Sequence, residues 1–155
     1  MKGQKEIIEL LNEVLAAELV AINQYFLHAK MCENWGYKKL YERTRAESID
    51  EMRHAEQLVD RILFLEGVPN LQRLDKLNIG QTVTEQLKSD LALEYSAVKR
   101  LNDGVALCLQ RGDNVSMTLL SEILVSEEKH VDWIETQLSL IEQLGETAYL
   151  AEQLG

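Results

Sequence analysis

One polar pattern occurs twice in the sequence at a fixed distance, and this repeat constrains the fold more than any other feature. A Glu-x-x-His motif stands at Glu51 and His54 and again at Glu127 and His130. A lone glutamate lies 33 residues before each motif, so an offset of 76 superposes the two halves of the chain. Because residues three apart share one face of a helix, each motif directs a carboxylate and an imidazole toward one point. The sequence therefore predicts two copies of one helical unit.

Apolar residues around the motifs recur in alternating steps of four and three, which is the spacing of a buried helical stripe. The stripes run from Leu11 to Cys32 and from Leu40 to Leu65, then from Leu87 to Cys108 and from Ser116 to Ile141. Glutamate and histidine interrupt them where leucine would be expected. Since a buried unpaired charge is costly, these groups need a partner or a metal. The interrupting residues that the offset relates are the predicted ligands: Glu18, Glu51, His54, Glu94, Glu127 and His130.

Turn-forming residues divide the chain into four long helices and a short fifth. Gly36 is expected to end the first helix, and Thr82 or Thr84 to cap the third. With 155 residues, one domain spanning residues 1–155 is the default, with its internal repeat at about 5–65 and 82–144. The expected helices are about Lys5–Asn34, Tyr37–Leu65, Thr82–Arg111, Val115–Leu144 and Glu146–Leu154.

Residues 70–81 form the only long connection between the expected helices. Fully extended, this segment reaches roughly 40 Å at about 3.3 Å per residue. A helix of about 28 residues has roughly the same length, 42 Å. The connection can therefore travel the whole bundle, and the third helix is expected to run parallel to the second. The prediction is an all-α four-helix bundle in the order up, down, down, up, whose hairpins are related by a pseudo-two-fold axis.

The six predicted ligands divide into two metal positions. Glu51 and Glu127 lie on facing helices, so each is expected to bridge two metals. Four carboxylates and two neutral imidazoles carry a charge of −4, which two divalent cations cancel. Mixed oxygen and nitrogen ligands suit iron or manganese with zinc as a competitor, and the lack of thiolate argues against a structural zinc site. Each position is completed by one terminal glutamate and one histidine, Glu18 with His54 and Glu94 with His130.

Two irons side by side can together give two electrons to one dioxygen or peroxide. Tyr25 lies two steps along the stripe from Glu18. It is either a redox or hydrogen-bonding neighbour of the centre or a buried packing residue.

Charge and cysteine usage limit the class of protein. The formal charge of −10 argues against a nucleic-acid binder and suits a protein that attracts cations. The first ten residues lack the apolar centre of a signal peptide, and no apolar run approaches the length of a membrane span. We therefore expect a cytoplasmic protein without a membrane partner. Cys32 and Cys108 should be buried free thiols near opposite ends of the bundle, too far apart for a disulfide.

Sequence strings around the predicted ligands resemble the bacterioferritins, and the likeness extends over the whole chain. The resemblance implies a ferritin-like bundle in a hollow shell of 24 subunits. It implies a ferroxidase that oxidises Fe(II) with dioxygen or hydrogen peroxide at a di-iron centre and stores the product as a ferric oxide or phosphate mineral. The strings are Met1-Lys2-Gly3, Glu18 to Ala29, Glu47 to Met52, Arg61 to Gly67, Pro69 to Gln72 and His130 to Trp133.

The resemblance also implies a haem b shared by two subunits, whose iron is bound by Met52 from each side. Met52 follows Glu51 directly, so it should point away from the metal centre. Release of stored iron would receive electrons from a small ferredoxin that docks near the haem. The residues that could line the same subunit interface are Leu19, Asn23, Phe26 and Ile49.

Two residues depart from the family's pattern. Arg45 and Ala46 stand where the family commonly has tyrosine and histidine. The missing histidine puts in doubt an inner-surface iron site that it would form with Asp50. The arginine replaces a residue near the haem, so haem occupancy or electron transfer there could differ. Neither change touches the six predicted ligands.

Two other functions remain open at this point. One is a di-iron enzyme that detoxifies peroxide and stores nothing, which a closed shell would argue against. The other is a non-catalytic subunit that supplies shell and haem to a different chain, which the complete ligand set argues against. The sequence leaves open the preferred oxidant and whether the irons stay as a cofactor or pass on into the shell. It also leaves open whether the shell holds one subunit type or two.

Overall fold

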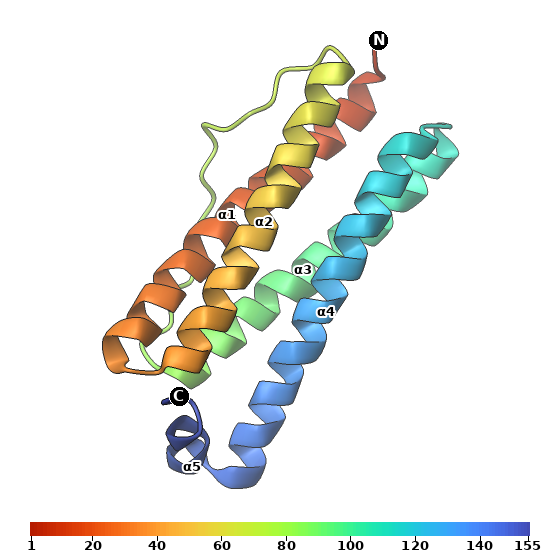
Figure 1. Ribbon diagram of the computed structural model, residues 1–155. Coiled ribbons are helices and arrows are strands. Elements are labelled where there is room, and N and C mark those ends of the chain that lie inside the picture. Colours follow the sequence, from red (N-terminus) through yellow and green to blue (C-terminus); the bar gives the residue numbers. More distant parts are fainter.

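The computed structural model describes all 155 residues and contains five helices and no strand (Figure 1). Every helix begins and ends within three residues of the predicted position, so the all-α class is confirmed. The helices are α1 (Lys5–Trp35), α2 (Lys38–Phe64), α3 (Val83–Gln110), α4 (Asn114–Leu144) and α5 (Glu146–Ala151).

The helices form two antiparallel hairpins, α1 with α2 and α3 with α4 (Figure 1). The connection after α2 runs in extended form along the bundle, so α3 points in the same direction as α2 (Figure 1). The predicted order up, down, down, up is therefore confirmed. The hairpins meet where α1 packs against α3 and α2 against α4. The sequence offset of 76 relates α1 to α3 and α2 to α4. The two hairpins therefore occupy equivalent places in the bundle.

The helix ends follow the expected local chemistry. Gly36 lies in the left-handed region at φ 90° and ends α1. Of the two candidate caps for α3, Thr82 is the one used, since its hydroxyl accepts from the Glu85 N–H at 3.2 Å. Asp113 caps α4, which was not predicted: its carboxylate accepts from the Ser116 N–H at 3.0 Å.

Buried hydrogen bonds hold the end of the crossover segment against α1. The Asn78 N–H donates to the Gln24 side-chain oxygen, and the Gly80 N–H donates to His28 Nε2, each at 3.0 Å. An Nε2 that accepts leaves the proton on His28 Nδ1, which donates to Asp90 of α3 at 2.9 Å. Gln24 also donates to Asp90, at 2.8 Å. Both ring nitrogens of His28, the third histidine of the chain, are thus used in hydrogen bonds that hold the fold together.

Two apolar clusters lie on either side of the mid-height of the bundle. Cys32 and Cys108 belong to different clusters, and both are buried and free, as predicted. None of the five helices has the apolar length that a membrane crossing requires. The larger cluster includes Leu11, Leu15, Leu58, Leu101 and Leu120, and the smaller includes Leu40, Leu87, Ile134 and Tyr149.

Candidate metal centre

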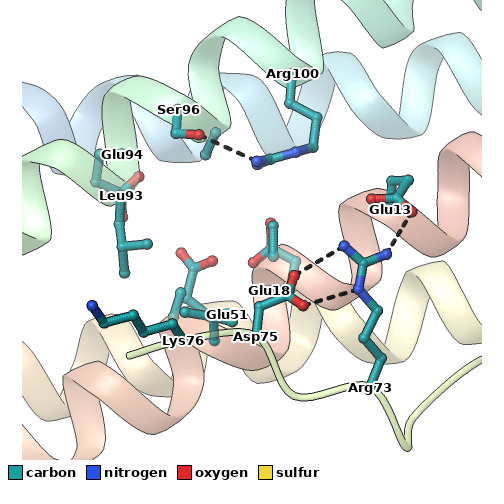
Figure 2. A pocket seen from close by; sticks show the side chains of 14 residues that line it. Glu13, Glu18, Glu51, Arg73, Asp75, Lys76, Leu93, Glu94, Ser96 and Arg100 are labelled. Atoms are coloured by element: carbon teal, nitrogen blue, oxygen red, sulfur yellow. Dashed lines mark hydrogen bonds and ion pairs between the residues drawn. The ribbon is translucent and has the colours of Figure 1, made fainter. Parts of the chain in front are cut away.

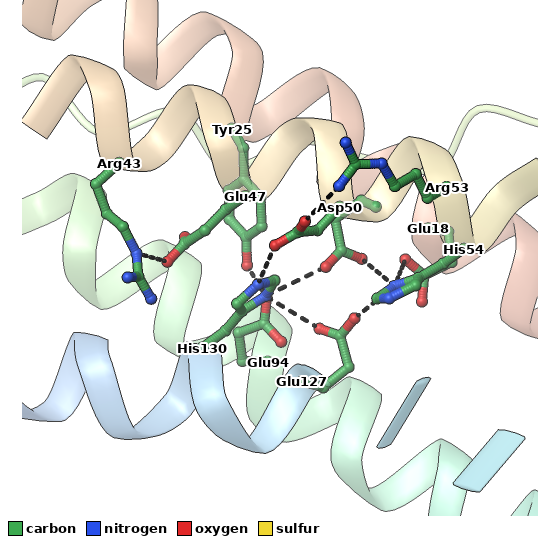
Figure 3. A network of polar contacts seen from close by, with 11 residues as sticks. Glu18, Tyr25, Arg43, Glu47, Asp50, Arg53, His54, Glu94, Glu127 and His130 are labelled. Atoms are coloured by element: carbon green, nitrogen blue, oxygen red, sulfur yellow. Dashed lines mark hydrogen bonds and ion pairs between the residues drawn. The ribbon is translucent and has the colours of Figure 1, made fainter. Parts of the chain in front are cut away.

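The six predicted ligands come together between the two apolar clusters, contributed by all four long helices (Figure 3). Each is between 1 and 9 % exposed, although all six are ionisable. They form two overlapping groups in which the ligand atoms lie within 4.8 Å of one another. We name the group of Glu18, Glu51, His54 and Glu127 position A, and the group of Glu51, Glu94, Glu127 and His130 position B.

Each histidine directs its Nδ1 atom at carboxylates from several helices. His54 Nδ1 lies 3.2 Å from a Glu127 oxygen and 3.5 Å from a Glu18 oxygen. His130 Nδ1 lies 3.2 Å from a Glu51 oxygen. Glu51 also lies 3.8 Å from His54 Nδ1, and Glu127 lies 3.6 Å from His130 Nδ1. Both glutamates therefore approach both histidines, as expected of groups shared by two ions.

Several buried polar atoms of the centre have no hydrogen-bond partner. Each such atom lowers the stability of the folded protein by about 1–3 kcal/mol unless an ion or ligand interacts with it. Two divalent cations would satisfy all of these atoms and cancel the charge of the four carboxylates. The atoms are Glu18 Oε2, Glu51 Oε1, His54 Nδ1, Glu94 Oε2 and Glu127 Oε1.

Without metal, the centre retains protons. Burial raises the pKa of Glu51 well above its usual range, and the neighbouring Glu18 adds to the effect. Burial and the neighbouring Glu127 likewise raise the pKa of Glu94. Burial alone would lower the pKa of His54, but the nearby carboxylates of Glu127, Glu18 and Glu51 outweigh it and raise that pKa to about 12. A metal that binds here must displace these protons.

The pKa of Glu127 shifts in the opposite direction. Burial would raise its pKa, but close contacts with Glu94, His130, His54 and Glu51 outweigh that effect and lower it. Glu127 thus keeps its charge in the middle of the centre, where both positions use it.

Tyr25 and Asp50 contact the ligands of position B. Tyr25 is fully buried and its hydroxyl donates to Glu94 Oε1, so it is both a packing residue and a hydrogen-bonding neighbour. Asp50 Oδ2 lies 3.4 Å from His130 Nε2, on the side of the ring opposite Nδ1 (Figure 3). This contact of Asp50 was not predicted from the sequence, where Asp50 entered only through the family resemblance.

Two cavities adjoin the centre. One, of about 160 Å³, is reached by Glu18, Glu51 and Glu94 and is lined on its outer side by residues 73, 75 and 76 of the crossover segment (Figure 2). The other, of about 240 Å³, lies between α2 and α4 and is lined by Asp50 and His54 among others. The centre is therefore approached from both faces of the bundle.

Met52 lies outside the centre, as its place beside Glu51 predicted. Its side chain is 55 % exposed, and Phe26 on α1 is 53 % exposed. Of the other candidate interface residues, Asn23 is exposed while Leu19 and Ile49 are half-buried. Arg45 and Ala46 are both exposed on α2.

Comparison with known proteins points to one family. Residues 8–144 match the Ferritin family, a ferritin-like domain. The chain is 54 % identical over 152 residues to the bacterioferritin of Mycobacterium leprae, covering 98 % of this chain and 96 % of that protein. It is 53 % identical over 152 residues to bacterioferritin BfrA of Mycobacterium tuberculosis, with the same coverage. The bacterioferritin of Streptomyces coelicolor is 53 % identical over 151 residues, covering 97 % of this chain and 90 % of that protein.

Proposed function

Because the chain belongs to the bacterioferritin family, whose role is iron storage, we propose that it oxidises Fe(II) at positions A and B and stores the ferric product. The observation that carries this proposal is the set of buried carboxylates and imidazoles whose free oxygen and nitrogen atoms converge on two adjacent points. Oxygen and nitrogen donors of this kind suit iron.

The role proposed for each ligand depends on whether it belongs to both positions or to one. Glu51 and Glu127, which belong to both positions, would hold both irons. Glu18 and His54 would hold only the iron at position A, and Glu94 and His130 only the iron at position B. Fe(II) binding displaces the protons that the metal-free centre holds, so binding is expected to strengthen as the pH rises.

The chemistry proposed is the ferroxidase reaction, in which four Fe(II), one dioxygen and four protons give four Fe(III) and two water molecules. Each iron loses one electron, and the dioxygen takes up all four. The carboxylates favour this direction, because a cluster of negative charges in a low-dielectric interior stabilises a trivalent ion more than a divalent one. Hydrogen peroxide is the alternative oxidant.

Storage requires a closed container, so we propose that the chain assembles into a shell of 24 subunits, alone or with a second subunit type. The ferric ions would leave the centre and form an oxide or phosphate mineral inside. A small ferredoxin would supply the electrons that return the mineral to Fe(II). We further propose a cytoplasmic location, which the two free cysteines fit because thiols stay reduced there.

A haem b is proposed between two copies of the chain. Met52 fits this role, because it presents an exposed soft thioether on the surface of α2, away from the carboxylates of the centre. Met52 from each copy would bind the haem iron, and Phe26 is an exposed apolar side chain available to pack against it. The bound haem would supply one-electron transfer between the shell surface and its interior.

The test of the ferroxidase proposal is to add Fe(II) to the metal-free protein in air and follow the ferric absorbance. Glu51→Ala and His130→Ala are expected to lose the fast phase of oxidation. Glu128→Ala is the matched control, since Glu128 is an exposed glutamate beside a ligand on α4 and should keep the fast phase. If Glu51→Ala and His130→Ala both keep the rate of the unaltered protein, the assignment is wrong.

Size exclusion of the same preparations separates storage from the two rival functions. A 24-subunit shell with a fast oxidation phase supports storage. A small oligomer that consumes peroxide would favour the detoxifying enzyme, and a shell without the fast phase would favour the non-catalytic subunit.

A further inference from the structure

The internal repeat relates the ligands of the two positions but not the residues around them. The offset of 76 carries each ligand of position A onto a ligand of position B or a shared one. The same offset relates polar residues near position B to different residue types near position A. Asp50 corresponds to Ser126, Tyr25 to Leu101 and Glu47 to Ile123.

On the position B side, both ring nitrogens of His130 face carboxylates. Its Nδ1 faces the carboxylates, and its Nε2 lies 3.4 Å from Asp50 Oδ2. The other oxygen of Asp50 lies 3.5 Å from Arg53 Nη1, which fixes the direction of the carboxylate (Figure 3). His130 is only 3 % exposed.

On the position A side, only one ring nitrogen of His54 faces carboxylates. Its Nδ1 faces the carboxylates, but no protein group forms a hydrogen bond with its Nε2. The ring lines the cavity between α2 and α4. Ser126, which occupies the place that the repeat assigns to a second aspartate, has a short uncharged side chain and makes no hydrogen bond to the ring.

This difference matters because a histidine that binds metal through one ring nitrogen needs the other nitrogen to carry the proton. A carboxylate that accepts this second N–H fixes the tautomer and the ring orientation and makes the metal-binding nitrogen more basic. We propose that Asp50 is the positioning residue for His130, and that positions A and B therefore bind metal with different affinities. The inference deepens the proposed function and rests on the metal centre described there.

The test is a titration of the metal-free protein with Co(II), together with crystals soaked at graded Co(II) concentrations and read by anomalous scattering. The crystals report the occupancy of each position separately. Asp50→Ala is expected to lower the affinity of position B by about ten- to a hundredfold, the usual effect of losing such a partner. Position A should change by less than about threefold. Asp50→Asn keeps an acceptor oxygen without the charge and should lie between.

A merely structural role for Asp50 would not change the proton on His130. Nitrogen-15 spectra of the Zn(II)-loaded protein, labelled at histidine, should show the Nε2–H form of His130 in the unaltered chain. In Asp50→Ala the Nε2–H should remain, because the metal holds Nδ1, but its proton should exchange faster with water since its acceptor is gone. Asp60→Ala is the matched control, because Asp60 is an exposed aspartate on the same helix. It removes the same charge and should leave both positions unchanged.

Ser126→Asp is the reciprocal experiment, because it places a carboxylate where the repeat predicts one for His54. It is expected to raise the affinity of position A and leave position B unchanged. Equal losses at both positions in Asp50→Ala, or no loss at all, would overturn the inference while Co(II) binding itself still supports the metal centre. Absence of Co(II) from both positions in the unaltered chain would overturn the proposed function and this inference together.

Discussion

Positions A and B use the same types of ligand on helices related by the same repeat, yet their surroundings differ. Around position B, a tyrosine hydroxyl bonds to Glu94 and an aspartate faces His130. Around position A, the repeat-equivalent residues are Leu101 and Ser126, and His54 borders a cavity. The ligands of the two positions are thus more alike than the residues that support them.

The comparison shows which residues the charge of the centre constrains. The four carboxylates need cations or protons, because a charged carboxylate left alone in this interior would be costly. No such requirement applies to the residues one contact further out, since leucine, serine, tyrosine or aspartate can each be accommodated by packing or hydrogen bonding. The outer contacts are therefore free to differ between the halves and to give the two positions different properties.

The largest expected effect comes from removing a shared ligand rather than a terminal one. Glu127→Ala takes a carboxylate from both positions and should lower the Co(II) affinity of each by on the order of a thousandfold, about 4 kcal/mol. Glu18→Ala should empty position A alone. Equilibrium dialysis should therefore change from two Co(II) per chain to none for Glu127→Ala and to one for Glu18→Ala.

Two exposed glutamates on the same helices, Glu9 and Glu128, are the controls for this experiment. Their alanine variants should retain two Co(II) per chain. If Glu18→Ala empties both positions, A and B are one cooperative unit, and the contrast between them has no consequence for binding.

The second prediction concerns the protons of the metal-free centre. The folded pKa of His54 is raised to about 12, whereas an unfolded histidine titrates near 6.5. Its contribution to stability is therefore fully present below about pH 6.5 and is lost as the pH rises toward the folded pKa, by up to about 1.4 kcal/mol per pH unit for one proton. The raised pKa values of Glu51 and Glu94 change the stability in the same direction. Their contribution is also lost as the pH rises above the pKa of the unfolded carboxyl group.

Urea unfolding of the metal-free protein at pH 6, 7.5 and 9 measures this dependence. The midpoint should fall as the pH rises, whereas the midpoint of the Co(II)-loaded protein should stay nearly constant because metal has replaced the protons. His54→Gln and His130→Gln, each tested alone, show how the dependence divides between positions A and B. A metal-free midpoint that does not change with pH would contradict the proton-holding centre.

The fold and the convergence of the six candidate ligands were predictable because both follow from spacing along single helices. Periodicity fixes which face of a helix is buried, and the cost of burying charge singles out residues such as Glu51 and His130. The length of the crossover segment then selects the order of the helices.

The contacts that distinguish the two positions were not predictable in this way. Whether Asp50 reaches His130, or Tyr25 reaches Glu94, depends on how each helix is rotated about its axis and which rotamer each side chain adopts. Helix rotation and rotamer choice depend on how two helices pack together, and they produce no periodic pattern in the sequence. The anchoring of the crossover by Gln24 and His28 was missed for the same reason.

The smallest expected effect tests the second polar contact of position B. Tyr25→Phe keeps the ring, which packs edge-on near His130 at 6.4 Å between centroids, but removes the hydroxyl that donates to Glu94. One such hydrogen bond contributes about 0.5–1.5 kcal/mol, so the Co(II) affinity of position B should fall about two- to tenfold. Position A should be unaffected, because its equivalent residue, Leu101, offers no donor. Equal losses at A and B would show instead that the change acts through the bundle as a whole.

The double variant with Asp50→Ala then decides whether these two contacts account for the inequality. Tyr25 acts on Glu94 and Asp50 acts on His130, so the two losses should add to within about 0.5 kcal/mol if the ligands respond independently. Position B should then lose the advantage that its polar neighbours give it. A remaining difference between A and B would have to come from Glu47, whose repeat equivalent is Ile123, or from the cavity that His54 borders, since the ligand types are the same.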